Sequence, residues 1–179
     1  MAEGSKKELS VHPWDDRMKT PQGQDLLLQY LVEVDKAETK EEACSLAAKI
    51  IAEKTSFSRP AVYLWNEREG CLELAGYANH NPSVRCIRSG QGICGRCYRT
   101  GAVQVVNDVL LDPDYFPDMS DTQAELSVPI VWHGRVFGVM DVEAAERNCF
   151  HEGDVRFSTL LVGILASVLS HIDAEMELQ

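Results

Sequence analysis

The chain lacks a long uninterrupted hydrophobic run. None of its apolar segments reaches the roughly 18–20 residues that cross a bilayer, and the longest, residues 160–169, is interrupted by Gly163 and Ser167. The first 16 residues are polar and lack the apolar centre of a signal peptide. The net charge of −11 argues against a general nucleic-acid surface, which is normally basic. These absences predict a cytosolic protein that binds neither a membrane nor nucleic acid.

Charges of one sign are also missing from two consecutive segments. No acidic residue lies between Glu73 and Asp108, and no lysine or arginine lies between Arg99 and Arg135. The first interval contains four arginines and three cysteines, namely Arg85, Arg88, Arg96, Arg99, Cys86, Cys94 and Cys97. Six acidic residues follow, namely Asp108, Asp112, Asp114, Asp118, Asp121 and Glu125. An acidic chain that keeps one acid-free segment of this length favours a functional positive patch.

The periodicity of apolar residues predicts an α/β (α+β) fold with mostly antiparallel strands. Helices are expected to begin at Thr20-Pro21 and at Thr39, where a capping side chain precedes an apolar stripe. The remaining expected elements are a hairpin (61–65 and 71–77), a strand (83–88), a short helix (93–98), a strand (102–106), a loop (108–121), a second hairpin (124–132 and 135–142) and a helix (152–176). We expect one domain over residues 20–179, after a flexible lead over residues 1–19.

Five local patterns in this order resemble a GAF domain. They are Gly90-Gln91-Gly92 with the following helix and Thr100-Gly101, then residues 106–109, 125–130 and 134–142, and finally Phe150 with Asp154. The resemblance covers roughly residues 24–173. It implies a central antiparallel sheet with helices on one face and a ligand pocket on the other. The short helix and the long loop would form the roof of that pocket.

Within that family the chain resembles the free methionine-(R)-sulfoxide reductases. The resemblance places Cys94 at a cysteine position and Cys86 close to a second one. It also implies that Glu125, Asp141 and Glu143 hold the amino group of a substrate. The catalytic cysteine of those enzymes belongs in the long loop, but residues 115–119 contain none. Asp118 cannot replace a thiol in a sulfenic-acid and disulfide cycle.

The cysteines leave several interpretations open. In a cytosolic chain, six cysteines favour free, buried or redox-active thiols over a disulfide framework. Cys94 and Cys97 form a C-x-x-C element on one side of a short helix, where they are either reactive or packed as small apolar residues. A metal cluster would need Cys86 as a third ligand and Cys71 as a fourth, without diagnostic spacing. We predict no metal and no cofactor.

The predicted ligand-binding residues combine both charge signs and one thiol. They are Arg88, Cys94, Asp108, Tyr115, Glu125, Asp141 and Glu143. In the alternative interpretation, the arginines pair with the negative loop, most loop acids are solvated, and Asp108 caps a turn. Charges of both signs favour a small polar ligand, either anionic or zwitterionic.

The leading hypothesis is a non-catalytic, small-molecule-binding sensor. The first alternative is a thiol-dependent reductase that uses Cys94, Cys86 or Cys97, and the second is a redox or metal sensor through the same three residues. The last helix carries two apolar stripes, which predict a homodimer through a helical bundle. A signalling partner protein, or an output domain outside this sequence, would receive the signal.

Overall fold

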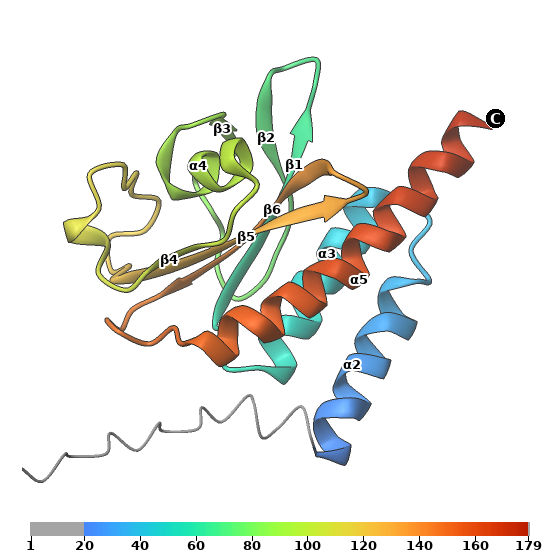
Figure 1. The fold of residues 1–179 in the computed structure, drawn as a ribbon, viewed down its shortest axis with the longest axis horizontal. Helices are drawn as coiled ribbons and strands as arrows, with labels where there is room; N and C mark the ends of the chain where they lie inside the picture. The colour runs from blue at the N-terminus through green and yellow to red at the C-terminus, as the bar shows by residue number, and fades with distance from the viewer. Residues whose placement is uncertain (1–19, 179) are drawn as a thin grey trace, which may run out of the picture.

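A six-stranded antiparallel sheet forms the centre of the computed structural model (Figure 1). The structure describes residues 20–178, so the lead predicted over residues 1–19 lies outside the described residues. The strand order is β3-β2-β1-β6-β5-β4. The strands are β1 (Arg59–Asn66), β2 (Cys71–Tyr77), β3 (Cys86–Arg88), β4 (Gln104–Val106), β5 (Ala124–Trp132) and β6 (Arg135–Ala144). The predicted fold class and the two predicted hairpins are confirmed.

The two faces of the sheet are covered differently. Three helices, α2 (Pro21–Val34), α3 (Lys40–Lys54) and α5 (Glu152–Glu177), lie on one face. The short helix α4 (Gly92–Thr100) and the loop that follows β4 lie on the other. That loop contains one 3-10 turn, η1 (Val109–Leu111). The main hydrophobic core lies between the sheet and the three helices.

Helix starts follow the capping residues that the sequence indicates. The Thr20 hydroxyl accepts a hydrogen bond from the Gly23 N–H at 3.2 Å, and Pro21 opens α2. Thr39 accepts from the Glu42 N–H at 3.2 Å at the start of α3. The Asp154 carboxylate accepts from the His151 N–H at 2.8 Å at the start of α5. Each cap satisfies a backbone group that a helix end leaves unpaired.

Most of the apolar surface of α5 is buried within its own chain. Leu165 and Leu169 are fully buried, whereas Leu160 is 45% exposed. Among the described helices, only α5 is long and apolar enough to cross a membrane. Half of its most apolar 18-residue stretch, however, is buried inside the fold. A buried core helix passes the same test, so this signal for a membrane span is weak.

Candidate functional site

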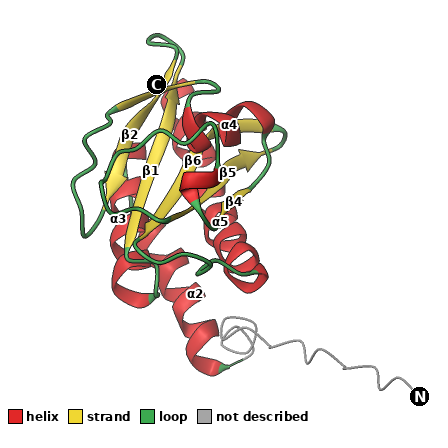
Figure 2. Ribbon diagram, turned by 90° about the vertical axis from the view of Figure 1, so that its left-hand side faces the viewer, coloured by secondary structure: helices red, strands yellow, loops and turns green. Residues whose placement is uncertain are grey.

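Four polar side chains form the floor of a pocket on the α4 side of the sheet. Side chains two residues apart on a strand share a face, which brings together Glu125 with Ser127 on β5 and Asp141 with Glu143 on β6. The strand register pairs Glu125 with Glu143 and Ser127 with Asp141. In Figure 2 the loop segments cross in front of the sheet and α3 lies behind it. Gly92 and Ile93 of α4 and Phe116 of the loop line the same cavity as the three acidic residues. All four floor residues are buried.

Hydrogen bonds link this floor to the thiol of Cys94. The Ser127 hydroxyl lies 2.7 Å from Asp141 Oδ1 and 3.3 Å from Glu125 Oε1. Cys94 Sγ, on the first turn of α4, lies 3.5 Å from Ser127 Oγ and 3.8 Å from Glu125 Oε1. At the margin, the Thr122 hydroxyl donates to Glu143 Oε2 at 2.5 Å. The floor therefore contains one hydrogen-bonded group around Ser127 and a separate Thr122–Glu143 pair beside it.

The acidic groups of the floor hold their protons more strongly than free carboxyls. Burial raises the pKa of Glu125 and of Asp141, and the nearby Asp141 raises that of Glu125 further. Burial, followed by Asp141, raises the pKa of Glu143 to about 7. Among the described residues that line the cavity there is no lysine, arginine or histidine. Crowded buried carboxyls without a cation stay partly protonated, because neighbouring negative charges repel one another.

The thiol of Cys94 is not activated in this environment. Burial, and then the charges of Asp141 and Glu125, raise its pKa well above the ordinary value. Cys97 is buried one turn later and packs in a small apolar cluster with Tyr63 and Val139. Its pKa is also raised, mainly by burial. Because the thiolate is the reactive form, neither cysteine is a ready nucleophile here.

The roof is fitted closely to the sheet edge. Gly90 and Gly92 have φ values of +82° and +66°, which favour glycine, so the Gly-Gln-Gly segment turns sharply into α4. A Cβ atom on Gly95 would lie 2.4 Å from the Arg88 carbonyl oxygen, so only glycine fits there without a shift of the backbone. The first turn of α4 is thereby held directly above the acidic floor.

Three polar contacts fasten the loop over the pocket. The Arg96 guanidinium of α4 binds Asp112 at 2.6 and 2.9 Å and Asp114 at 2.7 Å. The Asp118 carboxylate accepts hydrogen bonds from the backbone N–H groups of residues 83 and 84 at 2.8 and 3.1 Å. Arg59 of β1 binds Asp121 at 2.6 and 2.9 Å. Positive and negative segments of the sequence thus pair partly with each other, as the alternative interpretation expected.

The cavity beneath this roof is small. Its volume is about 30 Å³, which is room for one or two water molecules. An organic ligand therefore needs the loop to open before it can enter. The structure corresponds to a closed, contracted pocket.

Two predicted ligand residues lie elsewhere. Arg88 is exposed on the edge strand β3, because its buried neighbour Ile87 takes the face toward the pocket. Asp108 caps η1 by accepting from the Leu110 N–H at 3.2 Å, and it pairs with Arg147 at 3.2 Å. We therefore correct both assignments, since neither side chain belongs to the cavity.

Tyr115 lies at the margin of the pocket. Burial and the charge of Glu143 raise its pKa to about 12, and a hydrogen bond with Thr122 opposes this shift. The Tyr115 hydroxyl is thus near the Thr122–Glu143 end of the floor.

The sequence prediction does not include two polar residues of this site, Ser127 and Thr122. Ser127 follows Glu125 by two residues, so strand alternation contained the signal for it.

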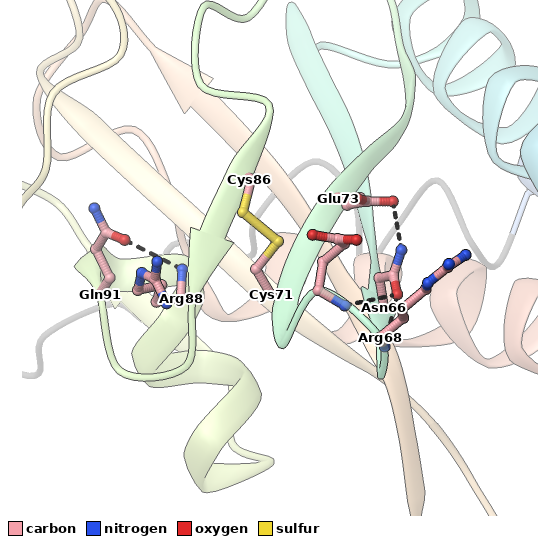
Figure 3. The surroundings of a disulfide bond; sticks show 8 residues. Asn66, Arg68, Cys71, Glu73, Cys86, Arg88 and Gln91 are labelled. Carbon is pink, nitrogen blue, oxygen red and sulfur yellow. Dashed lines mark hydrogen bonds between the residues drawn. A yellow bond between two sulfur atoms is a disulfide. The ribbon is translucent and has the colours of Figure 1, made fainter.

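Cys86 does not join Cys94 and Cys97. It forms a disulfide with Cys71 that cross-links β3 to β2 (Figure 3). The four other cysteines are free. The expectation of free thiols is therefore corrected for this pair, and the described residues assemble no site from Cys86, Cys94 and Cys97.

Cys94, Glu125 and Asp141 offer three donor atoms within 4.8 Å of one another, a set that suits a divalent cation.

A central antiparallel sheet with helices on one face and a short helix and loop over a polar pocket on the other defines a class of α+β domains. The family model described as "GAF domain" matches residues 34–170. The chain therefore belongs to the GAF domain family. This confirms the resemblance that the sequence motifs indicated.

Individual relatives include reductases. Protein YtsP of Bacillus subtilis is 31% identical over 108 residues, which cover 60% of this chain and 66% of that protein. The free methionine-R-sulfoxide reductase of Saccharomyces cerevisiae is 30% identical over 84 residues, covering 46% of this chain and 47% of the enzyme. The chain thus spans less than two thirds of the length of these curated relatives.

A solved structure agrees over a longer range. The free methionine-R-sulfoxide reductase from Neisseria meningitidis, in complex with its substrate, superposes with a TM-score of 0.79 at 25% identity. The match covers 85% of this chain and 90% of that chain.

Proposed function

We propose that this GAF domain is a non-catalytic receptor for a small ligand that carries a primary ammonium group. The observation that carries the proposal is the convergence of three buried acidic side chains, Glu125, Asp141 and Glu143, on one cavity. An ammonium group has three donors and a positive charge. It would satisfy these carboxylates and remove the electrostatic cost of ionising them in a buried site.

The other end of the ligand faces the start of α4. Gly92 and Ile93 line the cavity at the first turn of this helix. Unpaired N–H groups and the helix dipole at an N-terminus favour a negative group. A zwitterion such as a free amino acid has both charges at a suitable spacing. We therefore propose free amino acids and their close derivatives as the ligand class.

Three observations favour binding over catalysis. Residues 115–119, the loop region where the resemblance expects the catalytic cysteine, contain no cysteine, and Asp118 within this region anchors the loop to residues 83 and 84. Cys86 forms a disulfide bond with Cys71, so it offers no free thiol. Cys94 retains its proton because it is buried among acids. A thiol cycle needs an accessible thiolate and a partner thiol.

The test is calorimetric titration with a panel of free amino acids that includes methionine and methionine sulfoxide. N-acetylated forms of the same compounds serve as matched ligands without the ammonium group. We expect binding only to the free forms, and a loss of at least about tenfold for Glu125→Gln and for Asp141→Asn, since each removes about one charge-assisted hydrogen bond. Glu53→Gln, an exposed change on α3, is the control. Equal binding of the acetylated forms would refute the proposal.

The dependence of affinity on pH gives a second test. The ligand pairs with ionised carboxylates, and Glu143 ionises at about pH 7. Affinity should therefore rise as the pH increases through this value, and binding should release protons. Titrations in buffers with different ionisation enthalpies measure that release.

A second candidate, reduction of free methionine sulfoxide, is favoured by the reductases among the relatives and by the thiol inside the pocket. Turnover with a thioredoxin system, abolished by Cys94→Ser, would establish it. Binding without turnover would support the receptor.

We also propose that the domain acts in the cytosol as a homodimer and signals to a partner or output domain. Exposed apolar residues on α2 (Leu28, Leu31 and Val32) and Leu160 on α5 support this assembly. Light scattering over a dilution series tests it, and a monomer at all concentrations would contradict it.

A further inference from the structure

A second and larger cavity opens at the other end of α4. Pairing between β1 and β6 ends at Leu64 and Gly138. Beyond that point β1 continues with β2 alone, and β6 continues with β5 alone. The two hairpins diverge in Figure 1. The cavity near this fork has a volume of about 410 Å³, which is within the range of about 300–1,000 Å³ that is typical of small-molecule sites.

Three cations line this cavity, although the chain as a whole is strongly acidic. They are Lys40, Arg99 and Arg135. The half-buried Asp173 of α5 holds Lys40 at 2.6 Å and Arg135 at 3.0 Å. The Arg135 guanidinium also lies 4.5 Å above the ring of Phe137. Two of the cations are therefore positioned in advance by fixed neighbours.

Arg99 supplies a guanidinium that has no hydrogen-bonding or charged partner among the described residues. Within residues 20–178 it makes no ion pair and no hydrogen bond. Its side chain passes over Gly90, where a Cβ atom would lie 3.6 Å from Arg99 Nε. One acid, Glu67, also lines the cavity. The three cations outnumber Glu67 and Asp173, so the site keeps a positive balance.

An aromatic stack forms one wall. The rings of Trp65 on β1 and Tyr98 on α4 are stacked, with centroids 4.4 Å apart and planes at 15°. Both side chains are half-buried. Such a stack offers a flat apolar face beside the cations, and planar rings pack on aromatic faces.

We infer that this cavity, the Arg99 cleft, binds a planar aromatic anion, that is, a flat ring that carries a phosphate or carboxylate group. Arg99 and Arg135 receive the oxyanion, because a guanidinium binds both groups through paired hydrogen bonds. The Trp65–Tyr98 stack receives the ring. The Arg99 cleft attracts anions, whereas the acidic pocket at the start of α4 attracts cations. The two sites therefore bind different ligands, and the inference does not depend on the proposed function.

The test uses phenyl phosphate, benzoate and adenosine 5′-monophosphate as probes. Inorganic phosphate and adenosine are the matched fragments with only the charge or only the ring. Quenching of Trp65 fluorescence reports on the stack, in a background of Trp14→Phe and Trp132→Phe. We expect at least one ring-bearing anion to bind at least tenfold more tightly than inorganic phosphate and adenosine. The phosphate and carboxylate probes separate the two possible head groups.

Variants locate the binding. Arg99→Gln should weaken the probe about tenfold, and it breaks no side-chain hydrogen bond or ion pair among residues 20–178. Arg135→Gln should have a similar effect. Arg88→Gln, from the same positive segment but outside the cleft, should change nothing. Equal loss in Arg88→Gln, or equal binding of inorganic phosphate and the ring-bearing anions, would overturn the inference. Glu125→Gln should leave probe binding intact, which separates this outcome from failure of the acidic pocket.

Discussion

The two faces of the central sheet are built from the same strands but have opposite chemistry. On β5 and β6, Leu126, Val128, Met140 and Val142 point toward the helices and are fully buried among apolar groups. Their sequence neighbours Glu125, Ser127, Asp141 and Glu143 are buried on the α4 side, where the three acids line the small cavity and Ser127 hydrogen-bonds to two of them. Burial on the helical face removes apolar surface from water and stabilises the fold. Burial on the other face concentrates carboxyls, which costs stability and prepares a binding site.

The sharpest test of this contrast uses adjacent residues on opposite faces. Leu126→Ala should destabilise the protein by about 2–5 kcal/mol, because it leaves a cavity in the core. Ser127→Ala removes one hydroxyl from the polar network and should cost about 1 kcal/mol. Urea denaturation of both variants measures the difference. Equal losses would show that the two faces contribute to stability alike.

The disulfide should contribute next most. Cys71 and Cys86 are 15 residues apart, and a bridge that closes a loop of this length stabilises by about 3 kcal/mol in the chain-entropy model. Cys86→Ser should therefore lower stability by roughly 2–3 kcal/mol. Cys149→Ser, a change of a free thiol, is the control. Dithiothreitol should lower the stability of the wild type but not of Cys86→Ser, and an equal response in both would contradict the assignment.

Stability should also depend on pH through the acidic pocket. Glu143 ionises at about pH 7 in the folded protein, against an ordinary value of 4.5. Between these values the folded state binds more protons, so stability falls as the pH rises. The expected loss is roughly 2 kcal/mol from about pH 5 to about pH 7. Glu143→Gln should reduce this slope, which denaturation at several pH values measures, and an unchanged slope would assign the effect to other groups.

The smallest expected effect concerns the roof. Arg96→Gln removes the bonds to Asp112 and Asp114 and should cost about 1 kcal/mol or less of global stability, because these groups are partly exposed. Amide hydrogen exchange across residues 112–121 should nevertheless become several-fold faster. Arg96→Lys keeps the charge without the paired geometry and should give an intermediate rate. Unchanged exchange in both variants would mean that the loop does not depend on this contact.

Local patterns were sufficient to predict the elements and several floor residues. Capping by Thr20 and Thr39 and the hairpin of β5 and β6 follow from short-range chemistry that needs no partner segment. The family resemblance points to Glu125, Asp141 and Glu143, and the strand register pairs Glu125 with Glu143 and Asp141 with Ser127. The resemblance does not point to Ser127, although the same two-residue alternation places it on the same face.

Interactions between distant segments were not predictable in the same way. The pairing of Cys86 with Cys71 depends on the distance between β2 and β3. Side chains alternate along β3, which runs from Cys86 to Arg88. Ile87 is buried, so its neighbour Arg88 faces solvent. Arg96 meets Asp112 and Asp114 because α4 and the loop pack together. Charge sorting alone could not distinguish these partners from ligand contacts.

Local sequence patterns are enough to establish the order of elements, the two-residue alternation that separates an apolar face from a polar one, and the membership of a family. Those properties depend on each residue and its near neighbours. The folded structure adds which cysteines bond, which of the described arginines lack a charged or hydrogen-bonding partner, and how small the closed pocket is. These depend on distances between segments far apart in the chain, which local chemistry does not specify.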